Sequence, residues 1–370
     1  MRLSVPAPAR SCLFHVFNFL NNQELLLQKR ETTMPVPLDT DEATEMLTWS
    51  GFVETLHNVS ANTSTKAANS VIGKSEQGEP IYGFVFGEGP CTVSLVAGAH
   101  ADEPAGPNTL YRLVWALLEE PELYSTLLSE FRLLVIPHIN PDGDAANASW
   151  IRKWPDAEAA LSGMVRELPG RDVEFGYPGM RPENRSAAAF WKEHPPADLH
   201  ISLHGMAFSE GFLLLINDEW EARTRSWREM YHQKMRESGL PPHDHDRAGE
   251  KGFNYMGPGF TSTPKGSAMR AHFEKMGDPA TAAKFHMSSM EFQIERNPDV
   301  LCLVTELPLF LLPHSGNTGR PENYLAFRDA RSRREPDLLS RFSLSSLPLK
   351  RALDLHWFTI TSAMNLITGK

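Results

Sequence analysis

The stretch VAGAHADEPAGPNTL, from Val96 to Leu110, places a histidine and a glutamate directly after an apolar run. The apolar residues predict the end of a strand, and residues 106–120, GPNTLYRLVWALLEE, predict a helix because their apolar side chains recur at helical spacing. His100 and Glu103 therefore lie on a predicted strand-to-helix turn. An ordinary polar surface turn would have the same local pattern. Whether the two side chains have a function therefore depends on which other residues of the chain could act with them.

The composition is that of an ordinary soluble globular protein. The 370 residues are 41% hydrophobic and 22% charged, and the net charge of −10 argues against nucleic acid or an anionic membrane as a partner. Three cysteines (Cys12, Cys91 and Cys302) form no CxxC pair and are too few for a disulfide framework. No apolar run approaches 18 residues, so no transmembrane helix is expected. We expect a cytoplasmic location, with a periplasmic or secreted one left open.

The order of the predicted elements indicates an α/β fold. Residues 1–40 are predicted to be a poorly structured lead-in, because prolines interrupt every pattern, and residues 41–370 to be one folded domain. Strands and helices then alternate, which predicts a single domain with a mixed, mostly parallel central sheet flanked by helices on both faces. The predicted strands are 80–87, 91–99, 131–140, 199–205, 211–217 and 300–308, and the further predicted helices are 187–192, 218–238, 279–295 and the tail from residue 349.

Three connections are also predicted. The strands at 80–87 and 91–99 are expected to pair as a hairpin around the turn Glu88-Gly89-Pro90. The strand at 131–140 is expected to stop at a turn with the sequence NPDG, residues 140–143. Residues 144–185 have no clear period and are expected to form a long loop, and loops of that length are usually functional.

Two later strands end on groups that could join His100 and Glu103. In ADLHISLHGM, residues 197–206, strand alternation places His200 and His204 on one face, together with Asp198 and Ser202. At about 3.3 Å per residue the two histidines would be roughly 13 Å apart, so only one can share an ion with His100 and Glu103. The strand-terminal His204 is the better candidate, and His200 is expected to be a core or supporting histidine.

The strand VLCLVTELP carries Glu306 near its end, inside an apolar run. A lone carboxylate there is costly unless it is paired or functional, so Glu306 is either an ion-pair partner at the sheet edge or a general base beside a metal. Residues 243–246, HDHD, also offer ligand atoms. They lie among prolines and charges, and we do not expect them to bind metal.

Taken in order, these motifs resemble those of the zinc metallocarboxypeptidases, the carboxypeptidase A-like peptidases. The resemblance starts at SVIGKSEQGEPI and spans about residues 70–310. It continues through HxxE at His100 and Glu103, NPDG, NASWIRKW, ENR at residues 183–185, SLHG and TELP. Each motif is weak alone, but their shared order is specific. The resemblance implies one zinc ion per chain, and a peptide substrate with a free C-terminal carboxylate.

The resemblance also implies a role for each matching residue. The zinc ligands would be His100, Glu103 and His204. The catalytic residues would be Glu306, as general base, and Arg152, which polarises the scissile carbonyl. The terminal carboxylate of the substrate would be held by Asn184 and Arg185.

Two departures from the family pattern are visible. Many members carry an aspartate shortly before the Asn-Arg pair to orient a zinc-bound histidine. Here that role would pass to Glu183, Asp142 or another group. Many members also place a tyrosine over the substrate, and this chain offers Phe260 or Tyr255 in the corresponding region.

Two other functions are considered. Deacylases of the aspartoacylase and succinylglutamate desuccinylase type share the fold and would use the same metal to cleave N-acyl amino acids. A catalytically inactive zinc- or peptide-binding module would keep the ligands, but it would have no need of Glu306. The NPDG segment and the predicted loop after it favour the peptidase.

Overall fold

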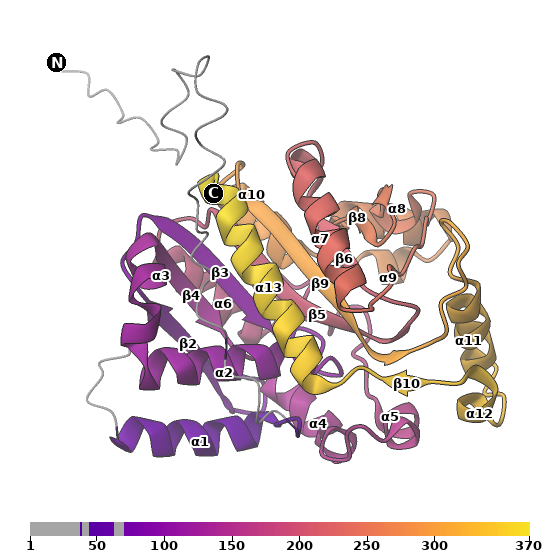
Figure 1. The fold of residues 1–370 in the computed structure, drawn as a ribbon, viewed down its shortest axis with the longest axis horizontal. Helices are drawn as coiled ribbons and strands as arrows, with labels where there is room; N and C mark the ends of the chain where they lie inside the picture. Colours follow the sequence, from indigo (N-terminus) through magenta and orange to yellow (C-terminus); the bar gives the residue numbers. More distant parts are fainter. Residues whose placement is uncertain (1–37, 39–43, 63–69) are drawn as a thin grey trace.

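The computed structural model describes residue 38, residues 44–62 and residues 70–370. Figure 1 shows one twisted sheet with helices on either side of it. The strands are β1 Ser70–Lys74, β2 Pro80–Phe86, β3 Cys91–Ala97, β4 Phe131–Ile136, β5 Leu199–Ser209, β6 Leu213–Ile216, β7 Tyr255–Gly257, β8 Phe260–Ser262, β9 Leu301–Leu311 and β10 Ser345–Ser346. The helices are α1 Trp49–Asn62, α2 Ala105–Glu119, α3 Ser125–Glu130, α4 Pro141–Ile151, α5 Ala157–Gly163, α6 Pro182–Lys192, α7 Arg225–Glu237, α8 Gly266–Lys275, α9 Pro279–Ala282, α10 Ser289–Arg296, α11 Glu322–Ser332, α12 Leu338–Phe342 and α13 Leu349–Thr368.

The sheet has parallel strands at its centre and antiparallel strands toward its edges. Its order is β1-β2-β4-β3-β5-β9-β6-β8-β7, with β10 beside β9. The central pairs β4–β3, β3–β5 and β5–β9 are parallel, whereas β2 and β6 run antiparallel to their central neighbours. This arrangement confirms the predicted α/β class with a mixed sheet. It also brings the carboxyl ends of β3, β5 and β9 to one edge, which is where α/β sheets bind ligands.

Alternating side chains of the central strands enter two different hydrophobic clusters. Val93 and Leu95 of β3 pack into the larger cluster with α1, α2 and α13, whereas Val96 packs into a second cluster with α6 and α10. In β5, Leu199, Ile201 and Leu203 enter the larger cluster. Because strand side chains alternate, the polar residues between them face the other side of the sheet.

The predicted hairpin of β2 and β3 is wrong, because β4 lies between these two strands. β2 instead forms a hairpin with β1, which pairs antiparallel with it. The β2–β3 connection passes over the start of β4, and a Cβ on Gly89 would lie 2.1 Å from the backbone of Glu130 and Phe131. Local sequence does not reveal such a crossing, since an intervening strand comes later in the chain.

The predicted turn at residues 140–143 is the start of a helix, and part of the predicted loop is helical. Asn140 caps α4 by accepting a hydrogen bond from the backbone of Gly143 at 3.1 Å, and Pro141 stands in the first turn. The helices α4 and α5 and the start of α6 lie within residues 144–185, whereas the parts at 152–156 and 164–181 are irregular, as predicted. The predicted helix at 279–295 is divided into α9 and α10, and α8, α11 and α12 were not predicted.

The prediction for residues 1–40 concerns, apart from Leu38, residues outside the described part. Leu38 itself is buried in the larger cluster. Within the described part, every helix is too short or too polar to cross a bilayer.

Candidate active site

The turn after β3 carries the first two candidate ligands. The chain reverses at Gly98, whose φ of +75° and close approach to His138 exclude a side chain. The backbone amide of Glu103 then donates to the carbonyl of His100 at 3.2 Å, just before α2 begins. This tight turn directs both side chains toward the middle of β5, where His204 directly follows the last residue that pairs with β3.

Three potential metal ligands converge at this edge of the sheet. His100 Nδ1 lies 3.1 Å from Glu103 Oε1, His204 Nδ1 lies 2.8 Å from Glu103 Oε2, and the two Nδ1 atoms are 3.0 Å apart. The ligand atoms of all three lie within 4.8 Å of one another. Two nitrogens on a tetrahedral zinc ion at about 2.05 Å would be roughly 3.3 Å apart, so this spacing fits a zinc site closely.

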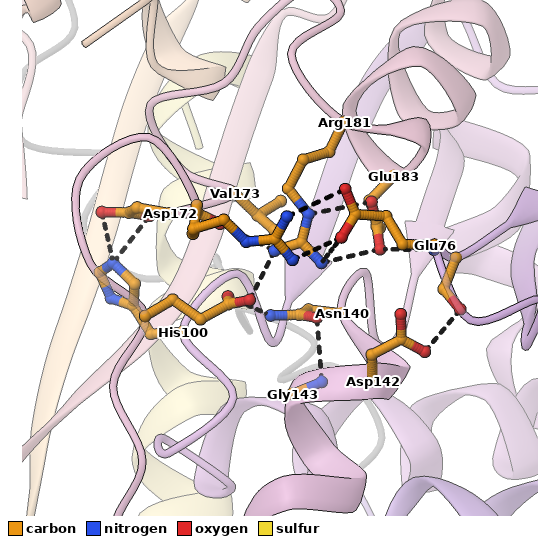
Figure 2. Close-up of polar contacts among 12 residues, drawn as sticks. Glu76, His100, Asn140, Asp142, Gly143, Asp172, Val173, Arg181 and Glu183 are labelled. Carbon is orange, nitrogen blue, oxygen red and sulfur yellow. Dashed lines mark hydrogen bonds and ion pairs between the residues drawn. The ribbon is translucent and has the colours of Figure 1, made fainter. Parts of the chain in front are cut away.

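Each histidine has a carboxylate on its other nitrogen. His100 Nε2 lies 3.3 Å from Asp172, as Figure 2 shows, and His204 Nε2 lies 3.1 Å from Glu174. When a carboxylate accepts a hydrogen bond from Nε2, the proton of the neutral imidazole is on Nε2 and Nδ1 carries a lone pair. The Nδ1 lone pairs of His100 and His204 are then directed at each other and at Glu103. Three electron-pair donors facing one point require a cation, and such carboxylate-backed histidines are typical of metal sites. The residues present therefore fit a bound metal.

The pKa shifts of the three groups also show that this point favours positive charge. Burial and Arg166 lower the pKa of His100, but Glu103 and Asp172 outweigh them and raise it to about 9. Burial also opposes charge on His204, but Glu103 and Glu174 raise its pKa well above the usual value. For Glu103, burial raises the pKa, and the cationic neighbours His100, Arg166 and His204 hold it well below the usual value. The carboxylates thus demand positive charge at this point.

Glu306 lies beside the cluster on the neighbouring strand. It is the register partner of His204 across the β5–β9 ladder, and its side chain lines a cavity of about 260 Å³ with His100 and Glu103. Burial and the charge of Glu103 raise the pKa of Glu306 to about 7. A carboxyl group with such a pKa can both accept and donate a proton near neutral pH.

Arg166 is one of the arginines that line this cavity, and it contacts Glu103. Its Nε lies 2.7 Å from Asp102, and its Nη2 contacts Glu103. Its side chain remains 43% exposed, so it can still reach a ligand in the cavity. Arg166 belongs to the irregular segment between α5 and α6, which also supplies Asp172 and Glu174.

A buried ion-pair network holds that irregular segment in place (Figure 2). The Arg181 guanidinium, only 2% exposed, donates to both oxygens of Glu183 and to the carboxylate of Glu167. It also donates to the carbonyl of Arg171 at 2.7 Å, next to Asp172. Breaking such a buried pair would leave an uncompensated charge, so the network fixes the segment strongly.

Neither residue considered as a replacement for the family aspartate contacts a ligand. Glu183 binds Arg181, and Asp142 accepts from Ser75 and from the backbone of Gln77. Asp172 contacts His100 instead. Sequence reasoning missed Asp172 and Glu174 because they stand in a segment without hydrophobic period. The family pattern does predict an aspartate that orients a zinc-bound histidine, but it places that aspartate close to Asn184 in the sequence.

The structure does not bring Arg152, Asn184 or Arg185 to the cavity. Trp150 and Ile151 bury the inner side of the last turn of α4, so Arg152 at its C-terminus is exposed. Asn184 is buried and donates to the carbonyl of Val173 at 2.7 Å, which is a structural contact. Arg185 is exposed on the outer face of α6 and donates to the carbonyl of Gly179.

The tyrosine positions also differ from the expectation. Phe260 is buried against Phe212 and Tyr231, and the Tyr255 hydroxyl donates to Asp244 at 2.7 Å. The tyrosine that lines the cavity is Tyr324 on α11.

His200 and the HDHD segment have other contacts. His200 bonds to Ser94 and Ser289, away from the cluster, and burial lowers its pKa to about 4. In the HDHD segment, His243 accepts from the backbone of Glu210, and Asp244 accepts from the backbone of Gly319. These contacts tie the segment to the chain that leads into α11.

Comparison with known proteins gives one sequence match. Residues 52–164 match the family model described as zinc carboxypeptidase, and no curated protein matches. Among solved structures, the chain is similar to a metallo-carboxypeptidase from Burkholderia cenocepacia (12% identity, TM-score 0.48, 87% of this chain and 70% of that one). It is also similar to one from Pseudomonas aeruginosa in complex with (2-guanidinoethylmercapto)succinic acid (16%, 0.45, 86% and 70%) and to bovine thrombin-activatable fibrinolysis inhibitor (13%, 0.45, 86% and 99%). The match over residues 52–164 confirms the resemblance to the zinc carboxypeptidase family that the motifs predict.

Proposed function

We propose that this protein is a zinc-dependent carboxypeptidase that hydrolyses the C-terminal amide bond of a peptide. The observation that carries the proposal is the convergence of His100, Glu103 and His204 where β3 ends beside the middle of β5. Two imidazoles and one carboxylate are a donor set that suits catalytic zinc and leaves a position for water. We propose one zinc ion per chain. When bound, it would supply Lewis acidity that polarises the scissile carbonyl and lowers the pKa of water to about 7.

Glu306 is the general base in this proposal. It lines the same cavity as His100 and Glu103 and is positioned by its register with His204. Its carboxylate takes a proton from the attacking water, which forms the new C–O bond. The same group then gives that proton to the leaving nitrogen as the C–N bond breaks. A binding module would have no use for a carboxyl group raised toward neutrality in this cavity.

Arg166 takes the role that the family resemblance gave to Arg152. Its guanidinium is in the cavity, whereas Arg152 is exposed at the end of α4. Asp102 and Glu103 fix the orientation of Arg166, so its donors are preorganised for the oxygen on which negative charge develops.

The test combines metal analysis with a substrate panel. Purified protein is analysed for zinc, stripped with a chelator and reloaded, then assayed on peptides with free C-termini, on the same peptides amidated, and on N-acyl amino acids. We expect one zinc per chain and zinc-dependent release of the terminal residue from the free acids. Cleavage of N-acyl amino acids alone would support the deacylase. Zinc binding without hydrolysis of any substrate would contradict the enzyme proposal.

A further inference from the structure

One face of α11 forms a wall of the active-site cavity. Tyr324, Phe327, Arg328 and Arg331 all line the cavity, and their spacing of three and four residues places them on one stripe of the helix. The cavity is thus lined both by two of the candidate metal ligands, His100 and Glu103, and by two arginines of α11. Neither arginine has a role in the proposed bond cleavage.

The lining of the cavity is cationic in a chain whose net charge is −10. Its charged members are Arg166, Arg328 and Arg331 against Glu103 and Glu306. Glu103 is committed to the metal cluster, and a bound zinc ion would add two further positive charges. With zinc bound, positive charge in the lining would exceed negative charge and would favour an anionic ligand.

Arg331 has no ionic partner among the described residues, and its guanidinium lies 5.3 Å from the ring of Phe208. It is nevertheless close to the metal side of the cavity. Burial is the main influence on its pKa and lowers it, Asp102 raises it, and Arg166 lowers it. Arg328 pairs with its neighbour Asp329 at 3.3 Å, and both side chains are 55% exposed. An exposed pair of this kind contributes little, so Arg328 can exchange it for a ligand.

The helix that carries these arginines is held rigidly. The buried carboxylate of Glu210 accepts from the backbone amides of Tyr324 and Ser315, at 2.9 and 2.6 Å. Phe327 is buried and its ring lies 4.7 Å from that of Phe208, which is the ring beneath Arg331. A rigid support of this kind suits a binding group that must keep its geometry.

We propose that Arg331 and Arg328 bind a carboxylate of the substrate and make the enzyme selective for anionic ends. This proposal rests on the proposed function and assigns to α11 the recognition that the family resemblance gave to Asn184 and Arg185. A guanidinium can hold a carboxylate through two parallel hydrogen bonds. The cavity of about 260 Å³ is smaller than the roughly 300–1,000 Å³ typical of drug-sized ligands, so it suits a single terminal residue.

The bound carboxylate can be the C-terminal group or an acidic side chain of the last residue, and four matched peptides separate these sources. They end in Ala or Glu, each as the free acid and as the amide. Arg331→Met keeps an apolar stem over Phe208 but removes the charge, and Arg331→Lys keeps the charge but removes the planar fork. Arg333→Met is the matched control, because Arg333 is exposed, pairs with Glu335 and does not line the cavity.

We expect Arg331→Met to raise KM about 10- to 100-fold for the peptides that carry the recognised carboxylate, with zinc content unchanged. Arg331→Lys should recover only part of that loss, and Arg333→Met should behave as wild type. A KM rise for both free acids identifies the C-terminal group, and a rise for both Glu peptides identifies the side chain. Equal kinetics of wild type and Arg331→Met on all four peptides would overturn the proposal.

Measuring the binding of a small dicarboxylate tests the carboxylate site independently of peptide hydrolysis. Succinate is titrated into the zinc-loaded protein by calorimetry, for wild type and Arg331→Met. If wild type hydrolyses no peptide but loses succinate affinity on Arg331→Met, the carboxypeptidase proposal fails and the carboxylate site stands. If wild type hydrolyses peptides and succinate binds both proteins equally, the carboxylate site fails and the carboxypeptidase proposal stands.

Discussion

Replacing Glu174 with glutamine should weaken zinc binding through His204. The Glu174 carboxylate accepts four hydrogen bonds: from the backbone and hydroxyl of Ser289 at 2.9 and 2.7 Å, from the hydroxyl of Ser202 at 3.2 Å, and from His204 Nε2 at 3.1 Å. Burial raises its pKa, but the bonds from His204 and Ser289 outweigh burial and keep the group ionised. All four partners donate, so an amide in this position must turn its NH2 group toward one of the donors.

The expected loss of zinc affinity depends on the tautomer of His204. If the glutamine NH2 faces Nε2, that nitrogen must accept, and the proton moves to Nδ1, the atom that would bind the metal. If the NH2 faces Ser289, a buried donor loses its acceptor. Loss of a partner that orients a metal ligand typically costs 10- to 100-fold in metal affinity, or about 1.4–2.7 kcal/mol.

The assay is competition for zinc with a chromogenic chelator at pH 7.5, and thermal unfolding of the metal-free protein checks the fold. Asp198→Asn is the matched control. Its carboxylate accepts from the backbone of Thr92 at 2.8 Å just before β5 begins, whereas His204 lies in the middle of that strand. A zinc dissociation constant for Glu174→Gln within twofold of wild type, or an equal loss in Asp198→Asn, would refute the reasoning.

Three further predictions concern the same region. His204→Ala should abolish zinc binding and His200→Ala should largely retain it, because His200 bonds to Ser94 and Ser289; equal metal loss, measured by atomic absorption, would contradict this. Glu306→Gln should keep zinc but lower kcat about 10²- to 10⁴-fold; wild-type turnover would place the base elsewhere. Burial lowers the pKa of His356 to about 3 in the folded protein. As pH falls, the unfolded chain therefore takes up a proton on this histidine before the folded chain does. The free energy of unfolding should then decrease between about pH 6.5 and pH 3, by up to about 1.4 kcal/mol per pH unit. Denaturant titrations of metal-free protein across this range should show a smaller slope for His356→Gln, and an unchanged slope would rule out this contribution.

The sequence predicted the ligand cluster because regular elements position it. His100 and Glu103 are close together in the chain, on a turn between a strand and a helix that are both strongly patterned. His204 and Glu306 stand on central strands, where the two-residue period indicates which side chains share a face. Their mutual register was not readable from either strand alone, and the structure shows it as a direct pairing across β5 and β9.

The roles at the substrate side were not predicted, because their positions depend on contacts rather than on periodicity. The segment with Arg166, Asp172 and Glu174 is held by the ion pairs of Arg181, and the start of α11 is held by Glu210. Polar anchors of this kind leave no period in the sequence. Motif order therefore identified the three side chains that converge, whereas it assigned arginine roles to Arg152 and Arg185, which the structure does not bring to the cavity.

The residues of the metal cluster and those of the cationic lining are held in place in different ways. The candidate metal ligands lie on β5 and on the turn after β3, where packing on both faces of the sheet restricts change. The cationic lining comes from two irregular or peripheral segments, each tied down by carboxylates: Glu183 with Glu167 in one case and Glu210 in the other. The α11 segment can therefore be re-anchored without moving a candidate metal ligand, whereas the segment with Arg166 also carries Asp172 and Glu174, which contact His100 and His204. Substitutions in α11 should change which substrate is bound, whereas substitutions around Glu174 should change whether the metal is held.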